Sequence, residues 1–194
     1  MNSMKNLEQT KKLNDDMQAF SSQKAPLLIA VDEEGGRDAR GKSFLEPAPS
    51  QESIGQSGDP DNATYWAKYN AGLLKSIDTN INFAPVADVS ATDTRSFSGD
   101  TDTVTKFVET AAQGYEEENF LYTLKHFPGV GKSTVDNHDN ISHIDASKEV
   151  LDTKDIPPFK KVIDDHDNSK FVAMVGHVIY DALDSVNAAS FSPP

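Results

Sequence analysis

Several side chains that can bind polar ligands or move protons follow directly after short apolar segments of this sequence. Carboxylates and imidazoles exchange protons and accept hydrogen bonds, and a lysine supplies a positive charge. A carboxylate at the end of a strand can accept hydrogen bonds from the hydroxyl groups of a sugar. The residues with these properties are Asp32, Asp88, Lys125, His126 and His177.

A further acid–base arrangement lies in the stretch that follows His126. Asp136 and His138 stand two positions apart, and this spacing lets the carboxylate hold the imidazole in one tautomer and raise its basicity. The neighbouring Asp139 and His143 support the alternative interpretation, a solvated loop, which the spacing alone favours. Carboxylates and imidazoles also ligate metals, but without a helical i,i+4 pair they indicate a metal site only weakly.

The segment from Gly129 to Thr134, Gly-Val-Gly-Lys-Ser-Thr, is typical of part of a phosphate-binding loop. The complete motif has its first glycine five positions before Gly131, where this sequence has His126. The motif also needs a magnesium-binding aspartate at the end of an apolar strand, and the apolar run 171–175 is followed by glycine and histidine instead. Nucleotide binding is therefore a minor alternative.

A glycine turn between charged residues follows the first apolar segment. The two glycines after Asp32, Glu33 and Glu34 allow a sharp turn and a close approach to a ligand. A helix N-cap or a turn acid is an equally good interpretation of these carboxylates. Arg40 and Arg95 are two of few arginines in an acidic chain, and each is expected either to clamp a polar ligand group or to lie on the surface.

Alternating helical and apolar segments are expected to bring these side chains together. Apolar periodicity predicts the helices, and short apolar runs predict the strands, of which the continuous run 27–31 fits a strand covered on both faces. Because strands and helices alternate, the pattern predicts a parallel sheet whose carboxyl ends meet at one edge. The predicted helices span residues 5–20, 60–77, 102–118 and 156–165, the predicted strands span 27–31, 81–86, 120–126 and 171–175, and loops are expected at 32–60, 127–147 and 177–194.

The composition excludes several classes of protein. The chain has 194 residues, no cysteine and a net charge of −13. Without cysteine it forms no disulfide, zinc finger or iron–sulfur site, and its acidity argues against nucleic acid or an anionic membrane as a partner. It has no run of about 18 apolar residues and no signal-peptide core. The compartment stays open between the cytoplasm, for the chain as given, and the cell wall or exterior, for a longer parent protein.

Five collinear motifs extend over nearly the whole chain. They comprise residues 26–37, 81–89, 95–97, 125–138 and 176–184. In order and spacing they resemble glycoside hydrolase family 3, and five motifs are more specific than one incomplete phosphate loop. The Lys-His-Phe-Pro-Gly segment followed by Asp-x-His indicates the β-N-acetylhexosaminidase branch of that family.

This resemblance implies a TIM-type (β/α)8 barrel, of which the chain supplies about four central βα units. It implies retaining hydrolysis of terminal β-linked N-acetylglucosamine in glycans such as cell-wall muropeptides, with no metal and no cofactor. By the same resemblance His138 is the acid/base and Asp136 orients it. Asp32, Arg40, Arg95, Lys125 and His126 match the sugar-binding positions, and Asp88 and His177 match positions that face the same pocket.

The chain also departs from the family pattern. Val130 and Lys132 replace the usual His and Asp, and Asn137 replaces the usual Ser or Thr between the catalytic pair. The family's nucleophilic Asp lies on a later strand that has no match here, so residues 1–194 are expected to form a partial N-terminal domain. A catalytically inactive sugar-binding or scaffold fragment is therefore the main alternative, and the open barrel edges are expected to allow self-association.

Overall fold

A four-stranded parallel sheet organises the computed structural model, which describes residues 4–21, 24–131 and 142–193. Its strands are β1 (Ala30–Val31), β4 (Ile81–Asn82), β5 (Leu121–Phe127) and β7 (Phe171–Val175). They lie in the order β1-β4-β5-β7, and every neighbouring pair is parallel. Because the order in space follows the order in the chain, the sheet has the topology of a barrel wall rather than of a doubly wound sheet.

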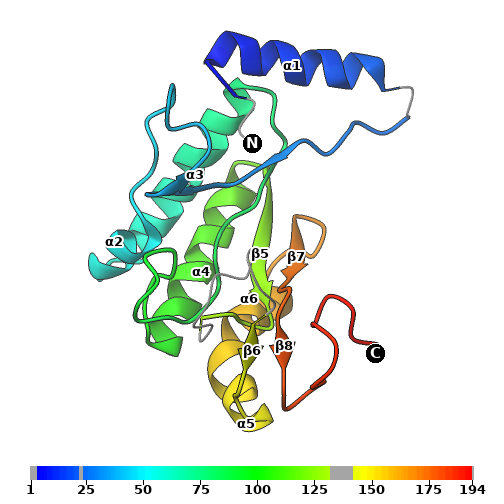
Figure 1. Ribbon diagram of the computed structural model, residues 1–194. Coiled ribbons are helices and arrows are strands. Elements are labelled where there is room, and N and C mark those ends of the chain that lie inside the picture. The colour runs from blue at the N-terminus through cyan, green and yellow to red at the C-terminus, as the bar shows by residue number, and fades with distance from the viewer. Residues whose placement is uncertain (1–3, 22–23, 132–141, 194) are drawn as a thin grey trace.

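A helix precedes each of these strands. The helices are α1 (Leu7–Phe20), α3 (Asp61–Ser76), α4 (Thr101–Glu117) and α6 (Pro157–Asp165). α4 packs between α3 and α6, and the three helices cover one face of the sheet (Figure 1). This alternation confirms the predicted barrel-type α/β fold in partial form. Within the described part of the chain, no helix is both long enough and apolar enough to cross a membrane.

Capping and apolar periodicity explain why α4 forms where it does. Asp100 accepts a hydrogen bond from the backbone N–H of Thr103 at 2.9 Å and so closes the first turn. Val104, Phe107 and Val108 recur at helical spacing and are buried. The observed helix agrees with the predicted one to within one residue at each end.

Aromatic rings join the helix layer to the sheet. Tyr122 on β5 stacks on Tyr115 of α4 with 5.6 Å between the ring centroids, and it lies the same 5.6 Å from Phe171 of β7. Burial raises the pKa of Tyr115 to about 12, so its hydroxyl stays protonated. Such aromatic pairs contribute about 0.5–1.5 kcal/mol beyond the area that they bury. These contacts fix the position of β5 relative to α4 and β7, and β5 carries two of the predicted site residues.

Residues 32–60 were predicted as a loop, but they contain regular structure. Gly35 and Gly36 have φ values of 97° and 56° and turn the chain back on itself. A Cβ on Gly35 would lie 2.3 Å from the carbonyl oxygen of Pro49, so a side chain is excluded there. The missed elements are the antiparallel pair β2 (Glu33–Gly35) and β3 (Asp38–Ala39) and the short helix α2 (Gln51–Gln56).

The first predicted strand is shorter than its apolar run suggests. Of residues 27–31 only Ala30 and Val31 pair with β4. Leu28 is 66% exposed, and the side chain of Gln18 hydrogen-bonds the backbone of Leu27. The prediction that this run is covered on both faces is therefore wrong for its first half.

Two further segments that were predicted as loops pair with each other. β6 (His143–Ile144) and β8 (Ile179–Tyr180) form a parallel pair, and α5 (Lys148–Val150) continues through a π-helix, η1 (Leu151–Asp155), into α6. A small second core forms beneath them from Ile144, Leu151, Val178 and Tyr180. Strand β7 at the margin of the sheet is partly open to solvent, because Val172 and Val175 are each 43% exposed.

Two helical glycines make opposite predictions about stability. A Cβ on Gly114 would lie 2.6 Å from the carbonyl oxygen of Thr64, where α4 crosses α3, whereas a Cβ on Gly72 meets nothing within 4 Å. We expect Gly114→Ala to lower the free energy of unfolding by about 1–3 kcal/mol through overpacking. Gly72→Ala should raise it by about 0.5–1 kcal/mol, because alanine is the better helix former. Urea unfolding of both variants measures the two changes in the free energy of unfolding. A stabilised Gly114→Ala protein would contradict the close crossing of α4 and α3.

Candidate functional site

A buried lysine at the carboxyl end of the sheet is the centre of the candidate site. Lys125 lies near the end of β5, and its Nζ is 2.9 Å from Asp32 Oδ1 and 2.6 Å from Glu34 Oε1. Its side chain is only 2% exposed. Both carboxylates follow β1, so these contacts connect the first and third strands of the sheet across β4. The structure thus brings Asp32 and Lys125 together, as the sequence predicts.

Arg95 shares the carboxylate of Glu34 with this lysine. Its Nε lies 2.8 Å from Glu34 Oε2 and its Nη2 lies 3.0 Å from Oε1, which is a two-pronged ion pair. Asp38 Oδ2 also lies near this guanidinium, 3.6 Å from Arg95 Nε. Burial alone would lower the pKa of Arg95, but the hydrogen bonds and charge of Glu34 outweigh it, so the pKa is raised and the guanidinium keeps its charge.

Asp88 and His126 form a carboxylate–imidazole pair beside this network. Asp88 Oδ2 is 2.8 Å from His126 Nδ1, and Oδ1 accepts the backbone N–H groups of His126 at 3.1 Å and Val130 at 2.8 Å. Because an ionised carboxylate only accepts, Nδ1 carries a proton and the ring orientation is fixed. Nε2 then faces Arg95 Nη2 at 3.5 Å.

The remaining predicted residues lie at the margin or elsewhere. Arg40 Nε is 4.0 Å from Asp32 Oδ2, and its side chain is 55% exposed. His177 is exposed and hydrogen-bonds Ser190 Oγ at 2.7 Å rather than the network around Lys125. The catalytic pair proposed from the sequence, Asp136 and His138, lies outside the described residues.

The glycine-rich segment serves this site in a different way from a phosphate loop. A phosphate loop binds its ligand through free backbone N–H groups. Here the N–H of Gly129 donates to the carbonyl of His126 at 2.8 Å, and the N–H of Val130 donates to Asp88. These bonds hold the end of β5 in place, and they argue against nucleotide binding by the described part of the segment.

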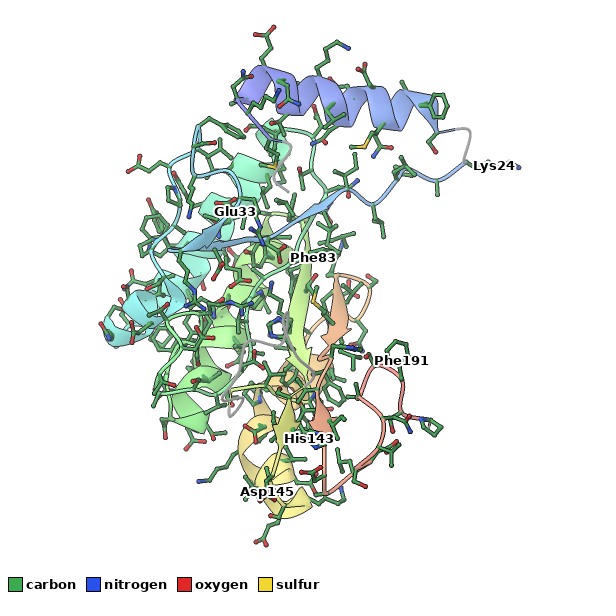
Figure 2. All side chains as sticks on the ribbon, viewed as in Figure 1. Lys24, Glu33, Phe83, His143, Asp145 and Phe191 are labelled. Carbon is green, nitrogen blue, oxygen red and sulfur yellow. The ribbon has the colours of Figure 1, made fainter. Side chains whose placement is uncertain are left out.

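Two carboxylates that the sequence-based site did not include have distinct environments. Glu34 holds the two cations, whereas Glu33, labelled in Figure 2, is fully buried and accepts the N–H of Gly41 at 2.9 Å. Side chains alternate in direction along an extended chain, so Asp32 and Glu34 share one face and Glu33 occupies the other. This period of two is the signal that could have added Glu34 to the prediction.

Burial of Glu33 predicts a specific dependence of stability on pH. Burial raises the pKa of Glu33 above its ordinary value of 4.5, and the hydrogen bonds from the Gly41 and Arg40 backbone only partly offset this. The stabilising contribution of this group is therefore fully present below about pH 4.5, the unfolded value, and is lost as the pH rises through the folded pKa.

Glu33→Gln is uncharged at every pH, so we expect it to gain stability relative to the unmodified protein as the pH rises from 4.5 towards 8. Urea unfolding at several pH values measures this difference. Glu46→Gln, an exposed site, serves as the control and should show no such trend. A pH-independent difference for Glu33→Gln would show that Glu33 titrates normally.

Other titratable and hollow features lie apart from this network. His143 pairs with Asp181 at 2.9 Å, is half-exposed, and lies well away from Glu33 in Figure 2. A cavity of about 310 Å³ lies beside β7 and is lined largely by apolar side chains, among them Phe127, Leu151 and Val175. Within residues 4–21, 24–131 and 142–193, no cluster of three or more His, Asp or Glu side chains could hold a metal ion.

The parallel sheet forms part of a barrel, and charged side chains lie at the carboxyl ends of its strands. These two features are typical of barrel-type α/β proteins, which bind their ligands at this edge. The chain belongs to glycosyl hydrolase family 3, because the model of that family's N-terminal domain matches residues 1–193. Beta-hexosaminidase A of Pseudoalteromonas piscicida is 32% identical over 175 residues, which cover 85% of this chain and 29% of that protein. Beta-hexosaminidase of Actinobacillus pleuropneumoniae serotype 3 (strain JL03) is 33% identical over 175 residues, which cover 86% of this chain and 50% of that protein.

Solved structures agree with this assignment. A glycoside hydrolase family 3 beta-N-acetylglucosaminidase from Paenibacillus superposes with a TM-score of 0.86 at 27% identity, over 97% of this chain and 37% of that one. NagZ from Neisseria gonorrhoeae, solved in complex with N-trifluoroacetyl-D-glucosamine, superposes with a TM-score of 0.84 at 27% identity, over 97% of this chain and 57% of that one. The chain spans half or less of the length of the two curated relatives above.

Proposed function

We propose that this protein is a β-N-acetylhexosaminidase that removes terminal β-linked N-acetylglucosamine from glycans such as cell-wall muropeptides. The observation that carries this proposal is the joined network of Asp32, Arg95, Lys125 and His126 at the carboxyl edge of a family 3 barrel. The names of the relatives support the same activity, since they are beta-hexosaminidases and beta-N-acetylglucosaminidases.

The site can bind an uncharged sugar through complementary donors and acceptors. The side chain of Asp32 is 34% exposed and can accept hydrogen bonds from sugar hydroxyl groups. Lys125 has three N–H donors, and among the described residues Asp32 and Glu34 engage two of them, so the third can serve a ligand. The imidazole of His126 is held by Asp88 and is 19% exposed at the same edge. Together they recognise hydroxyl groups, which both donate and accept.

The proposed chemistry is retaining hydrolysis with a histidine acid/base. By the family resemblance His138 protonates the leaving oxygen and then activates water, while Asp136 orients its ring. An imidazole with an ordinary pKa of about 6.5 can act in both roles near neutral pH. By the same resemblance the nucleophile is an Asp on a later strand of the barrel, and it would form the glycosyl-enzyme intermediate that water then hydrolyses.

Hydrolysis of an aryl β-N-acetylglucosaminide by the intact protein tests this function. We expect release of the aryl group without added metal or nucleotide. Binding of N-acetylglucosamine without hydrolysis would support the alternative of an inactive sugar-binding protein. Magnesium-dependent binding of ATP would overturn the proposal in favour of the phosphate-loop alternative.

A further inference from the structure

We propose that Glu34 is a positioning residue that sets the charge preference of the site, so that it selects an uncharged sugar over an anionic one. The inference rests on the proposed function, because it concerns the sugar pocket. It starts from a residue that sequence analysis did not place in the site and that contacts both Lys125 and Arg95.

Both oxygens of Glu34 are used by cations. Oε1 contacts Lys125 Nζ at 2.6 Å and Arg95 Nη2 at 3.0 Å, and Oε2 contacts Arg95 Nε at 2.8 Å. The side chain is 3% exposed, and its two oxygens are engaged by the two cations. Glu34 therefore acts on a ligand through Lys125 and Arg95.

The contacts balance the charge of the pocket. Lys125, Arg95 and Arg40 carry three positive charges, and Glu34, Asp32 and Asp88 carry three negative ones. The neighbouring Arg37 pairs with Asp38 at 2.8 Å and with Asp93 at 3.2 Å, so this group adds no positive charge. A neutral pocket favours hydroxyl and amide groups and gives an anion no net attraction.

Removing the Glu34 charge leaves one unbalanced positive charge. Lys125 is almost fully buried and Arg95 is 22% exposed, so water screens this charge much less than it screens a surface charge. An anionic group on a sugar would compensate the unbalanced charge, whereas a neutral sugar would not. The loss of Glu34 should therefore invert the preference as well as loosen the two side chains.

The test compares N-acetylglucosamine with N-acetylglucosamine 6-phosphate by calorimetric titration of the full chain. We expect Glu34→Gln to shift the ratio of the two dissociation constants by about tenfold or more towards the phosphorylated sugar. Glu46→Gln removes the same unit of charge at an exposed site and should leave the ratio unchanged. An unchanged ratio in Glu34→Gln would overturn the inference.

A second variant keeps the test decisive if Glu34→Gln does not fold, which circular dichroism reports. Glu34→Asp keeps the charge but shortens the side chain, so we expect weaker binding of N-acetylglucosamine with the ratio preserved. A Glu34→Asp protein that binds both sugars like the unmodified one would overturn the positioning role. If the unmodified protein binds neither sugar, the sugar-binding function fails as well, whereas normal binding with an unchanged ratio removes only this inference.

Discussion

Replacing Lys125 with methionine should lower the free energy of unfolding by about 3–5 kcal/mol and abolish binding of N-acetylglucosamine. Methionine fills nearly the same volume but leaves the carboxylates of Asp32 and Glu34 without their shared ammonium group. Removing one partner of a buried ion pair costs this much, and here Arg95 and the exposed Arg40 are left to balance the negative charges of Glu34 and Asp32. Urea unfolding followed by circular dichroism gives the stability, and calorimetric titration gives the binding.

Lys160→Met is the matched control. Lys160 Nζ lies 2.6 Å from Asp164, the same separation as between Lys125 and Glu34, but the Lys160 side chain is 68% exposed. An exposed pair of this kind contributes about 0–1 kcal/mol, so this variant should unfold nearly like the unmodified protein. Equal stability of the two variants would show that burial adds nothing to the Lys125 contacts.

The local sequence predicts best those helices and strands whose apolar pattern has clear ends. Residues 171–175 form a strand with the predicted ends, and α4 differs by one residue at each end. Residues 171–175 are a continuous apolar run that follows polar residues, and α4 has apolar residues at helical spacing after its N-cap, Asp100. Their type and position follow from local periodicity alone.

The elements that local sequence misses depend on contacts between distant segments. β6 and β8 are two residues each and exist only because residues 36 positions apart pair, as His143 does with Ile179. The run 27–31 shows the opposite error, since Leu27 and Leu28 are apolar but precede the point where β4 begins to pair. Neither the pairing nor its starting point is encoded within a short window.

For the site, the sequence likewise predicts the general location of the residues but not their specific contacts. Parallel topology predicts that the residues after each strand converge. Lys125 lies in contact with Asp32, and Glu34 connects it to Arg95, whereas His177, which follows β7, bonds Ser190 instead. The specific pairing of Asp88 with His126 needs the register of β4 and β5, which the sequence does not give. Asp136 and His138, outside the described residues, remain a prediction from the family resemblance.

Replacing His138 with alanine in the intact enzyme should slow hydrolysis of a natural β-N-acetylglucosaminide by about 10²–10⁴-fold, the usual contribution of general acid–base catalysis. The reason is that the leaving sugar oxygen is a poor leaving group and needs a proton as its bond to the anomeric carbon breaks. The measurement is kcat/KM for a chitobiose-type substrate, with the folded fraction checked by circular dichroism.

Comparing substrates with different leaving groups distinguishes an acid role of His138 from a purely structural one. A nitrophenolate departs without protonation, so formation of the glycosyl-enzyme from a nitrophenyl substrate should be nearly unaffected in His138→Ala. A burst of nitrophenol followed by slow turnover is then expected, because the second step still lacks its base. Equal slowing of both substrates, without a burst, would contradict the acid role. Asp136→Asn should show the same dependence on the leaving group, but more weakly, since it removes only the group that orients and charges the imidazole.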